Sequence, residues 1–296
     1  MPTTTSSKQT LWEEKMAVIE KKTQNSLHLR SNSLPSAAHP FASQFEDHLR
    51  RLSGSEATSS LSSSSVSHKL NEMLDLQDYT DKLLQLPTEQ QVLARECNEK
   101  WVDFLLEGSL RLLDICGEAK DCLQQSKESM CDLMSVIRRK KGNETGFAVE
   151  SVKYLSVRKK IKKQIQKALK NLKHKDNNTS PMLSFLNEAE AITMSSLESV
   201  LLFISAPKEH SRWSAISKLV QPKRVICDSQ ESTINEFEKV DAALQCLISH
   251  KPSSVENFQS HVENLELCIQ DLEIGVDHLS RKLIRNRVSL LNIFNH

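Results

Sequence analysis

Apolar side chains recur at steps of three and four residues through the middle of the chain, between Thr88 and Lys141. This spacing keeps one face of a helix against a partner, and a second apolar row lies beside the first. Two adjacent rows predict a central helix of a bundle. We expect this helix to begin at a capping box formed by Thr88 and Gln91 and to bend near Gly108 or Gly117. The two rows comprise Trp101, Leu105, Gly108, Leu112, Ile115, Ala119 and Cys122, and Val102, Leu106, Leu110, Leu113 and Cys116.

Further amphipathic segments predict helices over residues 41–52, 70–84, 148–173 and 181–205, and short ones over 11–22 and 213–220. The C-terminal third predicts a helical hairpin, whose first arm spans residues 225–249 and turns at Pro252. A regular heptad marks its second arm, and we expect this seam to pair within the chain. The seam comprises Phe258, Val262, Leu265, Ile269, Leu272, Val276, Leu279, Leu283 and, after the polar Asn286, Leu290.

These elements predict an all-α, multi-helix bundle with long antiparallel helical hairpins and a disordered N-terminal region. Residues 1–40 are expected to be flexible, with a short helix at 11–22. Residues 41–68 are expected to hold a short helix and a serine-rich linker over 53–67, and residues 69–296 the bundle domain.

Composition supports this class. The 296 residues are 38% hydrophobic, which suffices for a sizeable core, whereas six Gly and 5% aromatic residues are few for a strand-rich fold. Seven Cys without tight clusters predict reduced thiols inside the cell. No apolar run reaches the roughly 18 residues of a membrane span. We therefore expect a cytoplasmic or membrane-peripheral protein. A nuclear or plastid location is the alternative, and Glu13, Glu14 and Glu20 argue against a plastid transit peptide.

Positive charge is concentrated in one block. Residues 138–175 hold fourteen Lys or Arg and two Glu, whereas the rest of the chain holds 25 basic and 36 acidic side chains. The block could bind anionic lipid, direct nuclear import, bind nucleic acid, or complement acidic helices of the same bundle. Nucleic acid ranks lowest, because Tyr154 alone offers a stacking ring. The candidate residues are Arg138, Arg139, Lys140, Lys141, Arg158, Lys159, Lys160, Lys162 and Lys163.

Several segments together resemble the BYPASS-related proteins of land plants. They are residues 28–36 (HLRSNSLPS), His39-Pro40, residues 99–103 (EKWVD), 108–116 (GSLRLLDIC) and 154–160 (YLSVRKK). The resemblance spans about residues 25–294. It implies a helical plant protein with a relative linked to root and shoot development through a root-derived mobile signal. It supplies no agreed catalytic residues, and its name-bearing member is often placed in plastids.

The segment from Arg30 to Pro35 is a candidate phosphorylation motif. Arg30 stands three residues before Ser33, and Pro35 stands two after it, which is the arrangement that 14-3-3 proteins read. Phosphate on Ser33 would add about 1.5 to 2 negative charges and acceptor oxygens for an arginine cluster. The competing interpretation is a serine-rich tether that matches by chance.

No motif predicts catalysis, a cofactor or a metal. Glycine-rich phosphate loops, a nucleophile elbow and the diiron pattern are missing, and Cys246 with His250 lacks a second ligand pair. We expect a non-enzymatic interaction or regulatory protein in plant root and shoot development that uses its basic helix on an acidic partner or membrane surface. The alternative is an enzyme or small-ligand binder in the pathway of a mobile signal. The partner and the oligomeric state stay open.

Overall fold

The computed structural model describes residues 40–55, 62–96, 98–139, 144–170, 181–206, 235–248 and 255–295. Residues 44–296 form one compact unit, and residues 1–43 belong to a second. The described residues form helices and no strand, so the predicted all-α bundle is confirmed. The helices are α2 (Pro40–Ser55), α3 (Ser63–Leu84), α4 (Pro87–Glu96), α5 (Glu99–Arg138), α6 (Glu144–Lys170), α7 (Pro181–Ser205), α9 (Glu236–Ile248) and α10 (Val255–Phe294).

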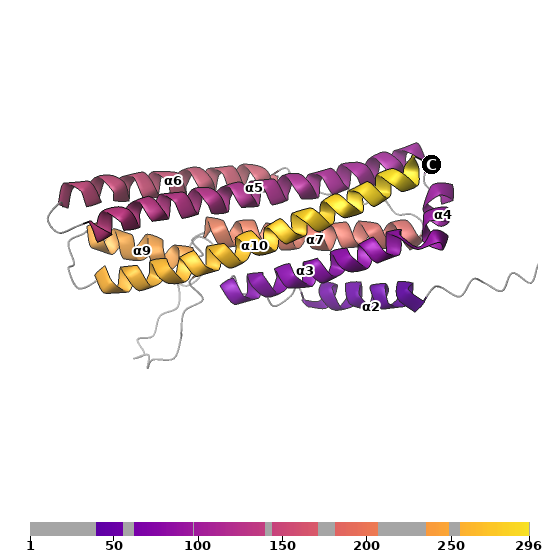
Figure 1. Ribbon diagram of the computed structural model, residues 1–296, viewed down its shortest axis with the longest axis horizontal. Helices are drawn as coiled ribbons and strands as arrows, with labels where there is room; N and C mark the ends of the chain where they lie inside the picture. Colours follow the sequence, from indigo (N-terminus) through magenta and orange to yellow (C-terminus); the bar gives the residue numbers. More distant parts are fainter. Residues whose placement is uncertain are drawn as a thin grey trace, which may run out of the picture. The chain divides into compact units, whose positions relative to one another are not determined.

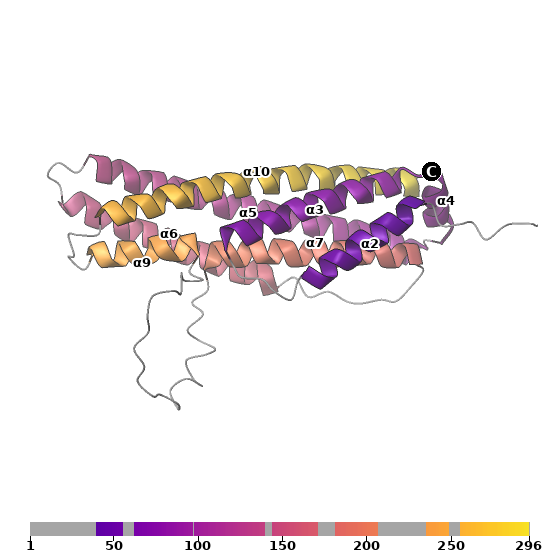
Figure 2. The ribbon, with the colours of Figure 1, turned by 90° about the horizontal axis from the view of Figure 1, so that it is seen from below.

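The heptad of α10 forms the axis of the core. Every apolar residue predicted for this seam is buried, and so is Asn286. The seam does pair within the chain, as predicted, but α9 covers only part of it. The longer α3 and α5 pack against α10 more extensively, and Figures 1 and 2 show both of them running beside it. A short antiparallel hairpin alone would leave most of a 40-residue helix uncovered.

The predicted central helix is two helices. α4 ends at Glu96, and α5 begins after Asn98, whose side-chain oxygen accepts a hydrogen bond from the Trp101 amide at 3.2 Å. A helix N-terminus leaves its first amides without intrahelical partners, and Asn is among the best residues for capping them. Thr88 is the second residue of α4, so the capping box predicted there is wrong.

α5 runs for 40 residues through Gly108 and Gly117, the two positions at which a bend was predicted, and neither glycine interrupts the helix. Gly108 lies instead where α7 approaches α5 closely. A β-carbon at this position would clash with the carboxylate of Glu190. Gly117 is exposed, and a β-carbon there would meet nothing within 4 Å. One glycine therefore permits a close helix contact, and the other has no packing role.

The first apolar row of α5 is buried from Leu105 onward, whereas the second row is mostly half-buried and Leu110 is exposed.

α5 and α6 form an antiparallel hairpin, because Lys153 of α6 pairs with Asp132 of α5, and Gln164 contacts Glu118 further back along α5. α7 runs from Pro181 to Ser205, as predicted, and packs on α3, α5 and α6.

The predicted serine-rich linker is shorter than expected. α3 begins at Ser63, and Ser62 caps it by accepting a hydrogen bond from the Ser65 amide at 3.3 Å. The sequence around Val66 looked too polar to pack, yet Val66 is buried, because one apolar residue per turn suffices where a neighbouring helix covers it. The helices predicted over 41–52 and 70–84 are confirmed, whereas those over 11–22 and 213–220 lie outside the described residues.

Candidate functional site

α6 carries most of the predicted basic site. Its inward face is formed by Tyr154, Ile161 and Ile165, which are at most 1% exposed and follow one another at steps of seven and four residues. This spacing fixes the rotation of the helix against α5, α7 and α9. The same rotation decides which of the basic side chains reach solvent.

The outer face of α6 carries lysines without carboxylates. Among residues 146–170, the part of this helix whose side chains the structure describes, the exposed side chains include no Asp or Glu. Lys153 is exposed but pairs with Asp132 and Glu150, both at 2.9 Å, and its pKa is raised by these two carboxylates. Five further lysines are exposed and have no ion-pair partner within the described part of the chain. We call them the lysine row: Lys159, Lys160, Lys163, Lys167 and Lys170.

Three members of the lysine row were predicted, and two were missed. Lys167 and Lys170 follow Lys163 at steps of four and three, so they share its face. This spacing was visible in the sequence. Their position in the last turn also complements the partial negative charge of the helix C-terminus, which is a structural reason for lysine there.

Two predicted residues of α6 point into the protein instead. Arg158 is 2% exposed, and its Nε lies 3.2 Å from Oδ1 of Asp241 on α9. The guanidinium carbon lies 4.4 Å from the centre of the Phe237 ring, which is a cation–π geometry. Lys162 is half-buried, and its Nζ lies 3.3 Å from the other oxygen of Asp241. Both cations therefore complement an acidic helix of the same chain and do not belong to the outer face.

Burial also sets the pKa values of the side chains beside Arg158 and Asp241. Tyr154 is 1% exposed, and burial raises the pKa of its hydroxyl well above the ordinary value, with Asp241 adding to the effect. On the neighbouring α5, burial raises the pKa of the Cys122 thiol to about 12. Both shifts favour the protonated forms, so neither the Tyr154 hydroxyl nor the Cys122 thiol is activated as a nucleophile, and the Arg158–Asp241 contact joins α6 to α9.

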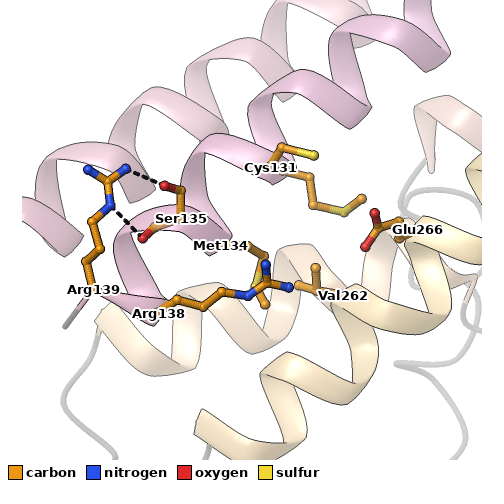
Figure 3. A pocket seen from close by; sticks show the side chains of 8 residues that line it. Cys131, Met134, Ser135, Arg138, Arg139, Val262 and Glu266 are labelled. Atoms are coloured by element: carbon orange, nitrogen blue, oxygen red, sulfur yellow. Dashed lines mark hydrogen bonds between the residues drawn. The ribbon is translucent and has the colours of Figure 1, made fainter. Parts of the chain in front are cut away.

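Arg138 and Arg139 end α5 at a distance from the lysine row, since the antiparallel hairpin places this end of α5 beside the first turns of α6. Arg139 donates to the carbonyl and hydroxyl of Ser135. Arg138 lines a surface hollow of about 270 Å³ between α5 and α10, where Glu266 lies on the opposite side (Figure 3). Lys140, Lys141 and the motif of Arg30, Ser33 and Pro35 lie outside the described residues.

A small cavity, lined mainly by leucines with a few polar side chains among them, lies between α3, α5, α7 and α10. Gln77 connects two of its walls, because its Nε2 donates to Thr193 at 2.9 Å and its Oε1 accepts from Asn286 at 2.7 Å. Glu190 also lines the cavity and pairs with Arg111 at 2.9 Å. The volume is about 50 Å³, far below the roughly 300 Å³ and more of small-molecule sites, so the cavity has room for water and not for an organic ligand.

Within the part of the chain that the structure describes, no three His, Cys, Asp or Glu side chains gather as a metal site would require. Cys246 is exposed on α9, and His250 lies outside the described residues. Among the described helices, none combines the length and apolar character needed to cross a bilayer.

Comparison with known proteins assigns a family. The model of the family described as Protein BPS1 matches residues 69–293, which covers the chain from α3 to α10. This match confirms the resemblance to BYPASS-related proteins. No curated protein and no solved structure matches the chain.

Proposed function

We propose that this chain, which belongs to the family described as Protein BPS1, is a non-enzymatic interaction protein that binds an acidic surface through the outer face of α6. The observation that carries the proposal is the lysine row, five exposed cations on one helix face without a carboxylate among them. From the family resemblance we further propose that this interaction serves plant root and shoot development.

The charges of the bundle itself support the proposal. Asp241 is already engaged by Arg158 and Lys162, and Asp132 and Glu150 are engaged by Lys153. The carboxylates that form ion pairs with α6 therefore pair with Lys153, Arg158 and Lys162, and within the described residues none pairs with the lysine row. Like charges held together on a surface repel one another, and an acidic partner relieves that repulsion.

The test is retention of the full chain on heparin–agarose under a rising salt gradient. Replacing Lys159, Lys160 and Lys163 with Glu should lower the salt concentration of elution strongly, because it reverses the charge of the face. The matched control replaces three exposed cations elsewhere, Lys82, Arg95 and Lys100, with Glu and changes the formal charge equally. Equal shifts for the two variants would contradict the proposal, since net charge alone would then explain retention.

A further inference from the structure

We propose that the acidic surface recognised by α6 is an anionic lipid bilayer, on which the helix lies with Val149 and Val152 inserted among the headgroups and the lysine row against them. The inference rests on the proposed function and names the partner of the same face. It is carried by the juxtaposition of exposed apolar and cationic side chains along one helix.

The two valines are the first observation. Val149 is 68% exposed and Val152 is 65% exposed, one turn apart near the start of α6. One exposed valine is ordinary on a protein surface, but the neighbouring Ala148 is exposed as well, and no partner helix covers these residues in the described chain. The buried Phe147 beside them anchors the turn to the bundle, so the valines project from a fixed support.

The valines and the lysine row share one face. Steps of three and four lead from Val149 through Val152 and Ser156 to Lys160 and Lys163. The face is therefore apolar at one end and cationic over the rest of its length. Helices that lie in the plane of a membrane interface combine apolar side chains with Lys or Arg in this manner.

The shape of the face favours a bilayer over a folded protein or peptide. Three surface hollows of this structure are lined by residues of α3, α5, α9 and α10 and by none of α6, and one of them is the hollow beside Arg138. The outer face of α6 is a convex helix surface with small side chains and lysines. Tight protein interfaces instead depend on aromatic or arginine anchors seated in pockets.

The strength of the interaction can be estimated from its charges. Each lysine close to an anionic leaflet raises partitioning by about fivefold at physiological salt. The charge reversal of Lys159, Lys160 and Lys163 should therefore reduce partitioning more than a hundredfold. Partial immersion of the two valines in the membrane makes a smaller contribution to partitioning, which salt does not screen. We expect vesicle partitioning to fall threefold to tenfold when both valines are made polar.

Co-sedimentation of the full chain with vesicles tests the inference. One set of vesicles is phosphatidylcholine alone, and the other contains about 30% phosphatidylserine, a content that gives the leaflet its negative potential. Four variants are compared with the unchanged chain. Two are charge variants, one with Lys159, Lys160 and Lys163 changed to Glu and its control with Lys82, Arg95 and Lys100 changed to Glu. The other two are V149S/V152S and L267S/I274S. The last variant removes two apolar side chains that are exposed on α10 and serves as the control for the valines.

We expect binding to the phosphatidylserine vesicles, with loss in the α6 charge variant, reduced salt-resistant binding in V149S/V152S and no change in either control. All exchanged residues are exposed, and circular dichroism melts establish that each variant is folded. If the chain does not bind vesicles but its retention on heparin depends on α6, the proposal of a bilayer partner is overturned and an acidic protein is left as the partner. Failure of both assays would overturn the proposed function as well. Equal losses in V149S/V152S and L267S/I274S would overturn the role of the valines.

Discussion

Replacing Gly108 with Ala should destabilise the protein, although alanine is the better helix former. The exchange gains about 1 kcal/mol of helix propensity. It also places a methyl group where the Glu190 carboxylate lies, so this side chain must leave its position against α5. Glu190 is 8% exposed and pairs with Arg111 at 2.9 Å, and losing such a charged hydrogen bond costs about 1.5–3 kcal/mol. The expected net loss is about 1 kcal/mol.

Gly117 supplies the control, because it lies in the same helix, is exposed and has open space around it. Gly117→Ala should stabilise the protein by about 1 kcal/mol. The propensity gain is common to both variants, so the difference between their urea unfolding free energies isolates the cost of moving Glu190, about 1.5–3 kcal/mol. Equal stabilities would refute this reasoning. In a Glu190→Ala background, Gly108→Ala should lose its penalty, which identifies the carboxylate as the cause.

Two further predictions rest on the structure and one on the sequence alone. Asp241→Ala should lower the unfolding free energy by about 3–5 kcal/mol in urea titrations, because it leaves the buried Arg158 without its counter-charge, and adding Arg158→Met should restore most of the loss. A peptide of residues 28–36 should bind a 14-3-3 protein only when Ser33 is phosphorylated, and equal affinities for both peptide forms would contradict the motif. Iodoacetamide at pH 8 should label the exposed Cys131 in the native protein and spare Cys116, whose thiol pKa burial raises to about 12; peptide mass mapping measures both, and rapid labelling of Cys116 would contradict its burial.

Periodicity alone predicted most of the fold, because a buried helix face repeats with the helix. The seam of α10 is the clearest example. Interruptions were harder to place. Asn98 sits inside a continuous apolar pattern, so its role as a cap became visible only from the structure. Gly108 was read as a point of bending, whereas its function depends on Glu190 of α7, 82 residues further along the chain. Such long-range partners leave no local signal.

The candidate site likewise combines features that the local sequence predicts with features that depend on distant parts of the chain. The basic block was evident from composition, but Arg158 and Lys159 are adjacent, similar residues with opposite surroundings. One signal could have separated them, since Arg158 falls in the apolar series of Tyr154, Ile161 and Ile165. The counter-charge on Asp241 could not have been found in this way. The sequence contains many carboxylates, and pairing depends on how α9 packs.

Asn286 has a consequence for how the long helices find their alignment. α3 and α10 run parallel, because Leu70 lies against Gly275 and, further along both helices, Asp81 pairs with Arg285; near this second contact Gln77 is bonded to Asn286. A heptad seam can slip by seven residues and still oppose apolar side chains. Slippage here would place the Asn286 amide against hydrocarbon and leave Gln77 without its partner, at a cost of roughly 1–3 kcal/mol for each buried polar group. The hydrogen-bonded pair of Gln77 and Asn286 thus selects one register of α3 against α10 among several that would bury similar apolar surface.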